Sequence, residues 1–123
     1  MNNEPQCEID EDGDRYWWLN GEWHREDGPA VEFANGSKQW YLNGYLHRKD
    51  GPAIESISGT KEWFLNGKRH REDGPAFDDG EEDKEWYLFG EEVQPEDVVD
   101  YNLAKGVFCY YDEKTEQLIF GGN

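Results

Sequence analysis

The sequence predicts a mainly β protein: an elongated antiparallel meander of 23-residue β-hairpin repeats with a small α+β cap at its C-terminus. Three observations support this fold class. Tryptophan recurs every 23 residues, at Trp17, Trp40, Trp63 and Trp86. Asn-Gly pairs, which favour the positive φ angles of tight hairpin turns, follow three of these tryptophans. Aromatic residues make up 15% of the chain, so rings rather than aliphatic side chains are expected to form the core.

The repeat unit is well defined. Three copies align without a gap, from Trp17, Trp40 and Trp63, and share the pattern W-aromatic-L-N-G-x-x-H-R-x-D-G-P-A. A fourth copy, WYLFGEEV from Trp86, keeps only the first half, and a short match at residues 13–15 precedes the first copy. A fixed period of this kind is typical of stacked repeats that bury their apolar faces against their neighbours. The sequence therefore predicts three full copies with a fraction at each end.

Each copy is expected to contain a hairpin. Side chains alternate between the two faces along the residues before each Asn-Gly pair, as in a half-buried strand. The Gly-Pro pair opens the next strand, because proline cannot donate a hydrogen bond in the middle of a ladder. The predicted strands lie near 15–19, 30–34, 38–42, 53–57, 61–65, 76–78 and 84–88. The segments from each Asn-Gly to the following Gly-Pro are expected to be ordered loops or loop-strand hybrids.

The last third of the chain departs from the repeat. Pro95, followed by two acids, predicts a helix that runs to about Ala104 and ends at Gly106. Strands near 107–111 and 117–120 should follow. We interpret residues 91–123 as a cap on the open edge of the array, since an exposed strand edge invites aggregation; an independent functional domain is the alternative. Of the helix residues, Val98, Tyr101 and Leu103 are expected to face the sheet.

The repeat resembles a known family. The run W-x-x-N-G-x-x-H-R is similar to the MORN repeat, which has a similar period and stacks β-hairpins into an elongated single-layer sheet. The variant HR-x-DGPA is similar to a MORN-like group of bacteriophages, bacteria and large DNA viruses. The resemblance covers residues 13–90 and implies a scaffolding or contact role. Two departures are that DGPA replaces the usual glycine-rich second half and that residues 91–123 have no counterpart.

The charge of the chain is strongly acidic and uneven. There are 29 acidic and 12 basic residues, a formal net charge of −17. The acidic N-terminal segment, residues 1–14, has six acids and no base; residues 15–76 have nine of each; residues 77–123 have fourteen acids and three bases. This balance argues against direct binding to nucleic acid or to an anionic membrane. Without an apolar run of spanning length or a secretory signal, a cytoplasmic location is expected, in the host if the protein is phage-encoded.

The densest acidic run predicts a surface for a basic partner. The acidic candidates are Asp78, Asp79, Glu81, Glu82, Asp83, Glu85, Glu91 and Glu92. A solvated turn that serves only solubility is the alternative. Trp23 and Tyr45 are aromatic residues that follow Asn-Gly turns and have no aromatic equivalent in the other copies. They are expected to be exposed contact anchors, with packing against a neighbouring loop as the alternative.

The histidines do not predict a zinc site. His24, His47 and His70 occur once per copy. Equivalent positions in successive hairpins lie about 9–10 Å apart, whereas the ligands of one zinc ion lie within about 3–3.5 Å of one another. We therefore expect a repeated structural contact at these positions.

The repeated Arg-x-Asp element predicts a locked loop. In each copy the arginine lies two residues before an aspartate, at Asp27, Asp50 and Asp73. Calcium is the alternative, but one aspartate per loop beside an arginine is a poor ligand set. No metal and no cofactor are predicted.

The two cysteines, Cys7 and Cys109, stand near opposite ends of the chain and are expected to be free thiols, with a single terminal disulfide as the alternative. Nucleophile-elbow, phosphate-loop and zinc-protease motifs are missing from the sequence, so no enzymatic activity is predicted.

These observations predict a non-enzymatic, acidic protein–protein interaction module. Its most concrete form is a phage-encoded, anti-CRISPR-like inhibitor that acts as a DNA mimic and blocks a nucleic-acid-binding host defence protein. The alternative is a structural scaffold that self-associates, for example as a homodimer, through its sheet edge.

Overall fold

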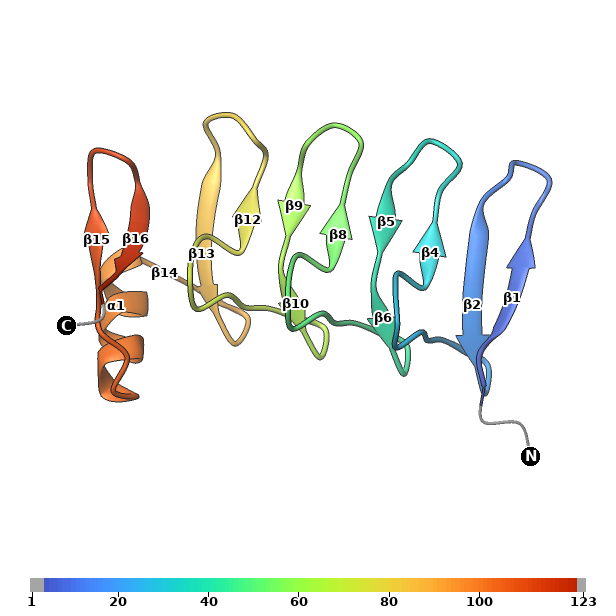
Figure 1. Ribbon diagram of the computed structural model, residues 1–123, viewed down its shortest axis with the longest axis horizontal. Coiled ribbons are helices and arrows are strands. Elements are labelled where there is room, and N and C mark those ends of the chain that lie inside the picture. The colour runs from blue at the N-terminus through green and yellow to red at the C-terminus, as the bar shows by residue number, and fades with distance from the viewer. Residues whose placement is uncertain (1–3, 122–123) are drawn as a thin grey trace.

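The computed structural model describes residues 4–121 and shows hairpins standing side by side in one row (Figure 1). The mainly β prediction is confirmed. The strands are β1 (Gln6–Ile9), β2 (Arg15–Leu19), β3 (Glu22–Trp23), β4 (Val31–Glu32), β5 (Lys38–Gln39), β6 (Tyr41–Leu42), β7 (Tyr45–Leu46), β8 (Ile54–Glu55), β9 (Lys61–Glu62), β10 (Phe64–Leu65), β11 (Lys68–Arg69), β12 (Phe77–Asp78), β13 (Lys84–Leu88), β14 (Glu91–Val93), β15 (Cys109–Asp112) and β16 (Gln117–Phe120). The helix α1 is Pro95–Ala104.

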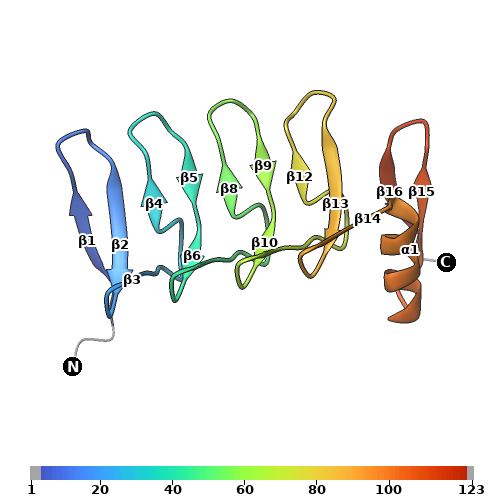
Figure 2. The same ribbon diagram turned by 180° about the vertical axis from the view of Figure 1, so that it is seen from behind.

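The row of hairpins forms a single layer. Within the described residues, ten strands make one antiparallel sheet in the order β1-β2-β4-β5-β8-β9-β12-β13-β14, with β3 paired to β2. Viewed from behind, the sheet has α1 only at its C-terminal end (Figure 2). Each hairpin is therefore held mainly by its two neighbours, as expected for a repeat array.

The register of the hairpins follows the sequence period. The cross-strand pairs are Glu8–Tyr16, Val31–Gln39, Ile54–Glu62 and Phe77–Glu85, each 23 residues after the one before. Strand β1 thus supplies the second half of a copy that precedes the first full one. We predicted no strand in residues 1–14, because Gln6–Ile9 lacks the DGPA signature; only its pairing with β2 shows that it belongs to the array.

The Asn-Gly turns have the expected backbone. Asn20, Asn43 and Asn66 have φ of 54°, 51° and 50°, and the glycine after each is also left-handed. Two successive positive φ angles match the twist of a two-residue hairpin turn. Phe89 takes the asparagine position in the fourth copy with φ 51°, and its ring lies 4.1 Å from that of His70.

The core is thin and lies in two places. Along the array, Ala30, Ala53 and Ala76 are wholly buried. At the C-terminal end, Trp86 packs with the buried Val98 of α1 and Leu118 of β16. Four partly buried residues pack around these three: Leu88, Val93, Val99 and Tyr111. The cap thus continues the fold of the array and closes its last hairpin.

The predicted cap elements are largely confirmed. Helix α1 has the expected bounds, and its first turn is held by a capping box between Gln94 and Asp97. The strands β15 and β16 lie where the sequence placed them, with β15 starting two residues later than predicted. Leu103 was expected to face the sheet but is 46% exposed, because Val98 and Asn102 occupy the inner side of α1. Within residues 4–121, no helix has the length and apolar character needed to cross a membrane.

Candidate functional site

The sheet presents two different faces, because side chains alternate along each strand. We call one the tryptophan–arginine face; it contains Trp17, Trp40 and Trp63 with Arg25, Arg48 and Arg71. We call the other the aromatic face; it contains Tyr16, Trp18, Trp23, Tyr41, Leu46, Phe64, Arg69 and Tyr87. The loops that connect successive hairpins run over the tryptophan–arginine face, since their arginines stack on its indoles.

On the tryptophan–arginine face, each full copy has the same locked loop. In the second copy, the Arg48 guanidinium lies 3.8 Å from the centre of the Trp40 ring. Its Nε donates to Asp50 Oδ1 at 3.1 Å and its Nη1 to the Pro52 carbonyl at 3.0 Å. The first and third copies repeat these contacts. The predicted Arg–Asp pairs are confirmed, and they leave these groups engaged within the loop.

The histidines join each copy to the next. The Nδ1 atoms of His24 and His47 accept the backbone N–H groups of Asn43 and Asn66, both at 2.9 Å, and His70 accepts that of Phe89 at the same distance. An Nδ1 that accepts a hydrogen bond carries no proton, so each ring is neutral with its proton on Nε2. We call these three contacts histidine clasps. The repeated structural contact expected from the sequence is therefore confirmed.

Two equivalent grooves lie between neighbouring loops of the tryptophan–arginine face. The first, of about 770 Å³, lies between residues 25–29 and 48–50 and includes Trp40 and Leu42. The second, of about 700 Å³, includes Trp63 and Leu65 one repeat later and is extended by residues of the cap. None of the residues predicted to bind a partner lines either groove. The recurring HR-x-DGP motif marks the loops that line these grooves, but the motif by itself does not show that neighbouring loops leave a space between them.

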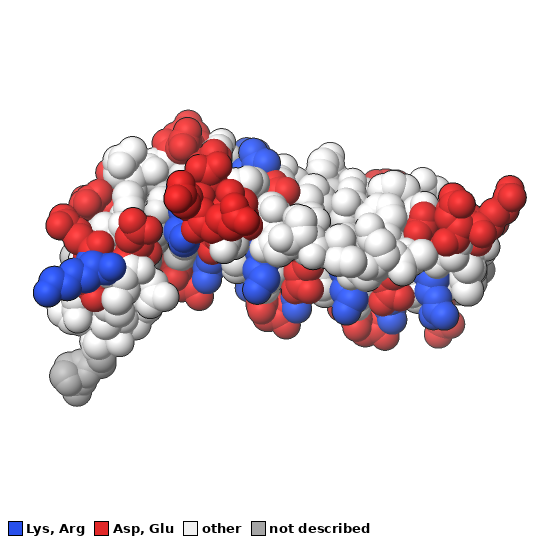
Figure 3. All heavy atoms as spheres, turned by 90° about the horizontal axis from the view of Figure 1, so that it is seen from above, with Lys and Arg blue, Asp and Glu red and all other residues white. Residues whose placement is uncertain are grey.

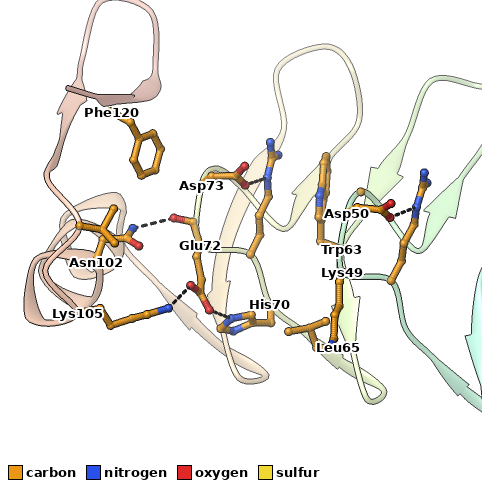
Figure 4. Close-up of a pocket in the computed structure, with 14 residues that line it drawn as sticks. Lys49, Asp50, Trp63, Leu65, His70, Glu72, Asp73, Asn102, Lys105 and Phe120 are labelled. Atoms are coloured by element: carbon orange, nitrogen blue, oxygen red, sulfur yellow. Dashed lines mark hydrogen bonds and ion pairs between the residues drawn. The ribbon is translucent and has the colours of Figure 1, made fainter. Parts of the chain in front are cut away.

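The second groove contains the main polar link to the cap. Glu72 accepts hydrogen bonds from Lys105 Nζ at 2.7 Å and is 2.8 Å from His70 Nε2, while its carbonyl accepts from Asn102 at 2.7 Å (Figure 4). Burial acts to raise the pKa of Glu72, but the hydrogen bonds from Lys105 and His70 outweigh it and hold the pKa below its usual value. The carboxylate thus stays ionised and anchors α1 to the third copy.

Acidic side chains gather in turns along one edge of the row of hairpins. The turns of the hairpins share the upper edge in Figure 1, and acidic groups gather over three of them, at 10–14, 79–83 and 112–116 (Figure 3). The intervening turns, 33–37 and 56–60, contain no acid. Residues far apart in the sequence thus form one row of turns, which we call the turn edge.

The predicted acidic residues do not form a single surface. Glu81, Glu82 and Asp83 are exposed on the turn edge. Asp78 and Asp79 hold the turn: Asp79 Oδ1 accepts the N–H groups of Glu81 and Asp83 at 2.8 and 3.1 Å, and Asp78 Oδ1 accepts that of Gly80 at 2.8 Å.

The other predicted residues are scattered. Glu85 lies in β13 and accepts a hydrogen bond from the hydroxyl of Tyr87 at 3.0 Å. Glu91 and Glu92 lie in β14, opposite the last two residues of β13 and away from the turn edge. Trp23 pairs with Trp18 on the aromatic face, whereas Tyr45 pairs with Leu42 on the opposite face. Both are exposed, as expected, at 41% and 60%.

One cluster of carboxylates was not anticipated. Ligand atoms of Asp10, Asp12 and Asp14 lie within 4.8 Å of one another, in the turn between β1 and β2. The alternating D-x-D-G-D spacing was the signal for it. However, Asp10 Oδ1 already accepts the N–H groups of Asp12 and Asp14, and Asp14 Oδ1 accepts that of Ala34.

We expect calcium and chelator to leave the melting temperature unchanged. The Asp10 and Asp14 oxygens are engaged with backbone groups and the turn is open to water, so they supply too few free ligands for a calcium ion. Differential scanning calorimetry in millimolar calcium and in EDTA measures this. A melting temperature that rises in calcium and returns to its original value in Asp12→Asn would contradict the expectation.

Both cysteines are free, as predicted, with Cys7 exposed and Cys109 buried. Comparison of the chain with family models, with curated proteins and with solved structures finds no match. The resemblance to MORN-like repeats therefore rests on the sequence motif and stays a prediction, while the hairpin array itself is a property of the structure.

Proposed function

We propose that this chain is a protein–protein interaction module that binds a basic protein surface along its turn edge. The observation that supports this most is the gathering of three acidic turns along one edge of the row of hairpins (Figure 3). Fields of one sign on a surface steer partners of the opposite sign and favour their orientation. A rigid row of turns would hold these charges at fixed spacing.

The acids of the turn edge are not neutralised within the molecule. Within the described residues, the ion pairs engage Asp27, Glu32, Asp50, Glu55, Glu62, Glu72 and Asp73, none of which lies in an acidic turn. The bases in these pairs come from the repeat loops, from β11 and from the end of α1. The negative charge on the turn edge therefore remains available to a partner.

The partner we propose is a protein that itself binds nucleic acid. Such proteins carry basic surfaces that accept a row of phosphates. The acidic turns at 10–14 and 79–83 are three hairpins apart, which corresponds to about 29 Å at the usual strand spacing. Two negative regions at this separation, with neutral turns between them, would occupy an extended basic surface and exclude nucleic acid from it.

Reversing three exposed charges on the turn edge should abolish the binding. We expect Glu81→Lys/Glu82→Lys/Asp83→Lys to lose capture of the basic partner, because these side chains project from the turn, whereas Asp78 and Asp79 must be kept to hold it. Capture from bacterial lysate on the immobilised chain, with mass spectrometry and then titration of the purified protein at several salt concentrations, measures this. Affinity of the unaltered chain should fall steeply with salt.

The matched control reverses three acids elsewhere. Glu22→Lys/Glu26→Lys/Glu91→Lys makes the same change in net charge and places lysine where other copies carry Lys68 or Lys49. It should retain binding if the position of the charge matters. Equal loss in both variants would mean that only the net charge acts, and full binding by the turn variant would overturn the proposed function.

A second candidate function is self-association through the sheet edge. Within the described part of the chain, β1 pairs only with β2, and all four of its residues are exposed. An unpaired strand edge is a template for another strand. Glu8 on β1 and the acids of the adjacent turn would oppose pairing of two such edges, so we favour the basic partner.

A further inference from the structure

We propose that two copies of this chain pack face to face through their aromatic faces and form a two-layer β-sandwich dimer. A sheet with an apolar face is normally buried against a second layer of strands or helices. Here the tryptophan–arginine face is covered by the loops between hairpins, and α1 packs at one end of the array (Figure 2). The second layer for the aromatic face would come from another molecule.

The aromatic face is a nearly continuous strip of rings. Trp23 lies between two of them, with its ring centre 5.9 Å from that of Tyr16 and 5.1 Å from that of Tyr41. Further along, the guanidinium of Arg69 lies 5.5 Å from the ring centres of both Phe64 and Tyr87. The strip thus extends over the four copies and is organised before any partner arrives, which lowers the entropic cost of association.

The surface of the single chain is unusually large for its mass. The accessible area is 8015 Å² for 14.4 kDa. A compact monomer of this mass exposes about 6,800 Å², so the excess is about 1,200 Å². A stable protein–protein interface buries about 800 Å² on each partner. Among residues 4–121 the buried apolar residues are few, and three of the eight are alanines. Face-to-face packing would bury area that the single layer leaves in water.

Charge favours one arrangement of the two copies. Towards the middle of the aromatic face the ionisable groups are paired: Arg69 Nη2 donates to Glu62 at 2.7 Å, and Glu85 accepts a hydrogen bond from the hydroxyl of Tyr87. Glu8 and Glu92, opposite Tyr16 and Tyr87 at the two ends of this face, have no ion pair among the described residues. The densest groups of acids without an ion pair lie on the turn edge. Two copies would therefore pack with their turn edges on opposite sides of the sandwich, where like charges are farthest apart. The proposed partner surface stays accessible in this dimer.

The test compares two aromatic residues at neighbouring strand positions on opposite faces. Trp23→Glu places a charge in the strip, at the position that Glu92 takes in the fourth copy. Tyr45→Glu is the matched control, at the position that Glu22 takes in the first copy, on the other face. Because the repeat already accepts glutamate at both positions, both variants should fold, which circular dichroism checks. Sedimentation equilibrium over a range of protein concentrations then gives the mass.

We expect the unaltered chain and Tyr45→Glu to approach twice 14.4 kDa at high concentration, and Trp23→Glu to remain at 14.4 kDa. Added salt should strengthen the dimer, since it screens the repulsion between two acidic chains. Salt should instead weaken binding of a basic partner to the turn edge. The two proposals can therefore fail independently, and the response to salt tells which of them has failed. A monomeric unaltered chain at every concentration, or a Trp23→Glu dimer, would overturn the inference, and the latter would point to the edge of β1.

Discussion

Replacing Trp86 by alanine should lower the free energy of unfolding by about 3–5 kcal/mol, which is typical for removal of a large buried aromatic side chain. Trp86 is 7% exposed and packs with Val98 of α1 and Leu118 of β16. The rings of Trp86 and Tyr111 also pack edge to face, with 5.9 Å between their centres. In the full copies an arginine covers the equivalent indole. The fourth copy lacks that arginine, so the cap takes its place and Trp86 joins the array to the cap.

Urea denaturation followed by far-UV circular dichroism, at a protein concentration low enough to keep the chain monomeric, measures this effect. The control is Trp23→Leu, which introduces the residue that the second copy carries as Leu46 at the equivalent position. It should cost less than Trp86→Ala, because Trp23 is 41% exposed and the repeat already carries leucine at this position. If Trp86→Ala were no worse than this control, the cap would not depend on the fourth tryptophan.

Lowering the pH should destabilise the array through the histidine clasp of His47. Protonation of His47 puts a hydrogen on Nδ1, which then faces the Asn66 N–H that Nδ1 accepts in the neutral ring. Burial, and then the charge of Lys49, lower the pKa of His47. A folded-state pKa below the unfolded one means that the stabilisation is present above the unfolded value of about 6.5 and is lost as the pH falls through the folded value.

The clasp of His47 is worth about 1 kcal/mol, so about that much stability should be lost as the pH falls from neutral through the folded-state pKa of His47. Urea denaturation curves at a series of pH values across this range measure how the free energy of unfolding changes with pH. The informative variant is His47→Asn, whose side-chain oxygen can accept the Asn66 N–H without titrating. It should remove part of the pH dependence. If the free energy of unfolding of His47→Asn depended on pH as strongly as that of the unaltered chain, protonation of His47 would not be the cause of the loss.

Much of the fold could be predicted from the sequence because the signals are local. The Asn-Gly pairs require left-handed backbone at adjacent residues, and the structure has it at Asn20, Asn43 and Asn66. The Arg-x-Asp spacing brings guanidinium and carboxylate together within one loop, and Pro95 with the acids after it begins a helix at the expected residue. In each case the interacting groups lie within a few residues of one another, so their spacing in the sequence is enough to predict the contact.

The sequence predicted less of the candidate site. The acidic run was interpreted as one turn, yet Asp78 and Glu85 are strand residues, and two of its aspartates bind backbone N–H groups. The remaining acids become part of a larger surface only because the turns at 10–14 and 112–116 lie on the same edge. Composition records how many charges a chain has, but the distance between charged turns depends on how hairpins stack.

Local spacing therefore determined the repeat, its turns, its locked loops and the helix, whereas contacts between copies were decided by the tertiary structure. Strand β1 carries no repeat signature and is a strand because β2 offers it an edge. Trp23 and Tyr45 both follow an Asn-Gly turn, but a shift of one position along the hairpin sends them to opposite faces. The clasps join residues 19 apart, across the boundary between copies, and exist because stacking in register brings each histidine to the next turn.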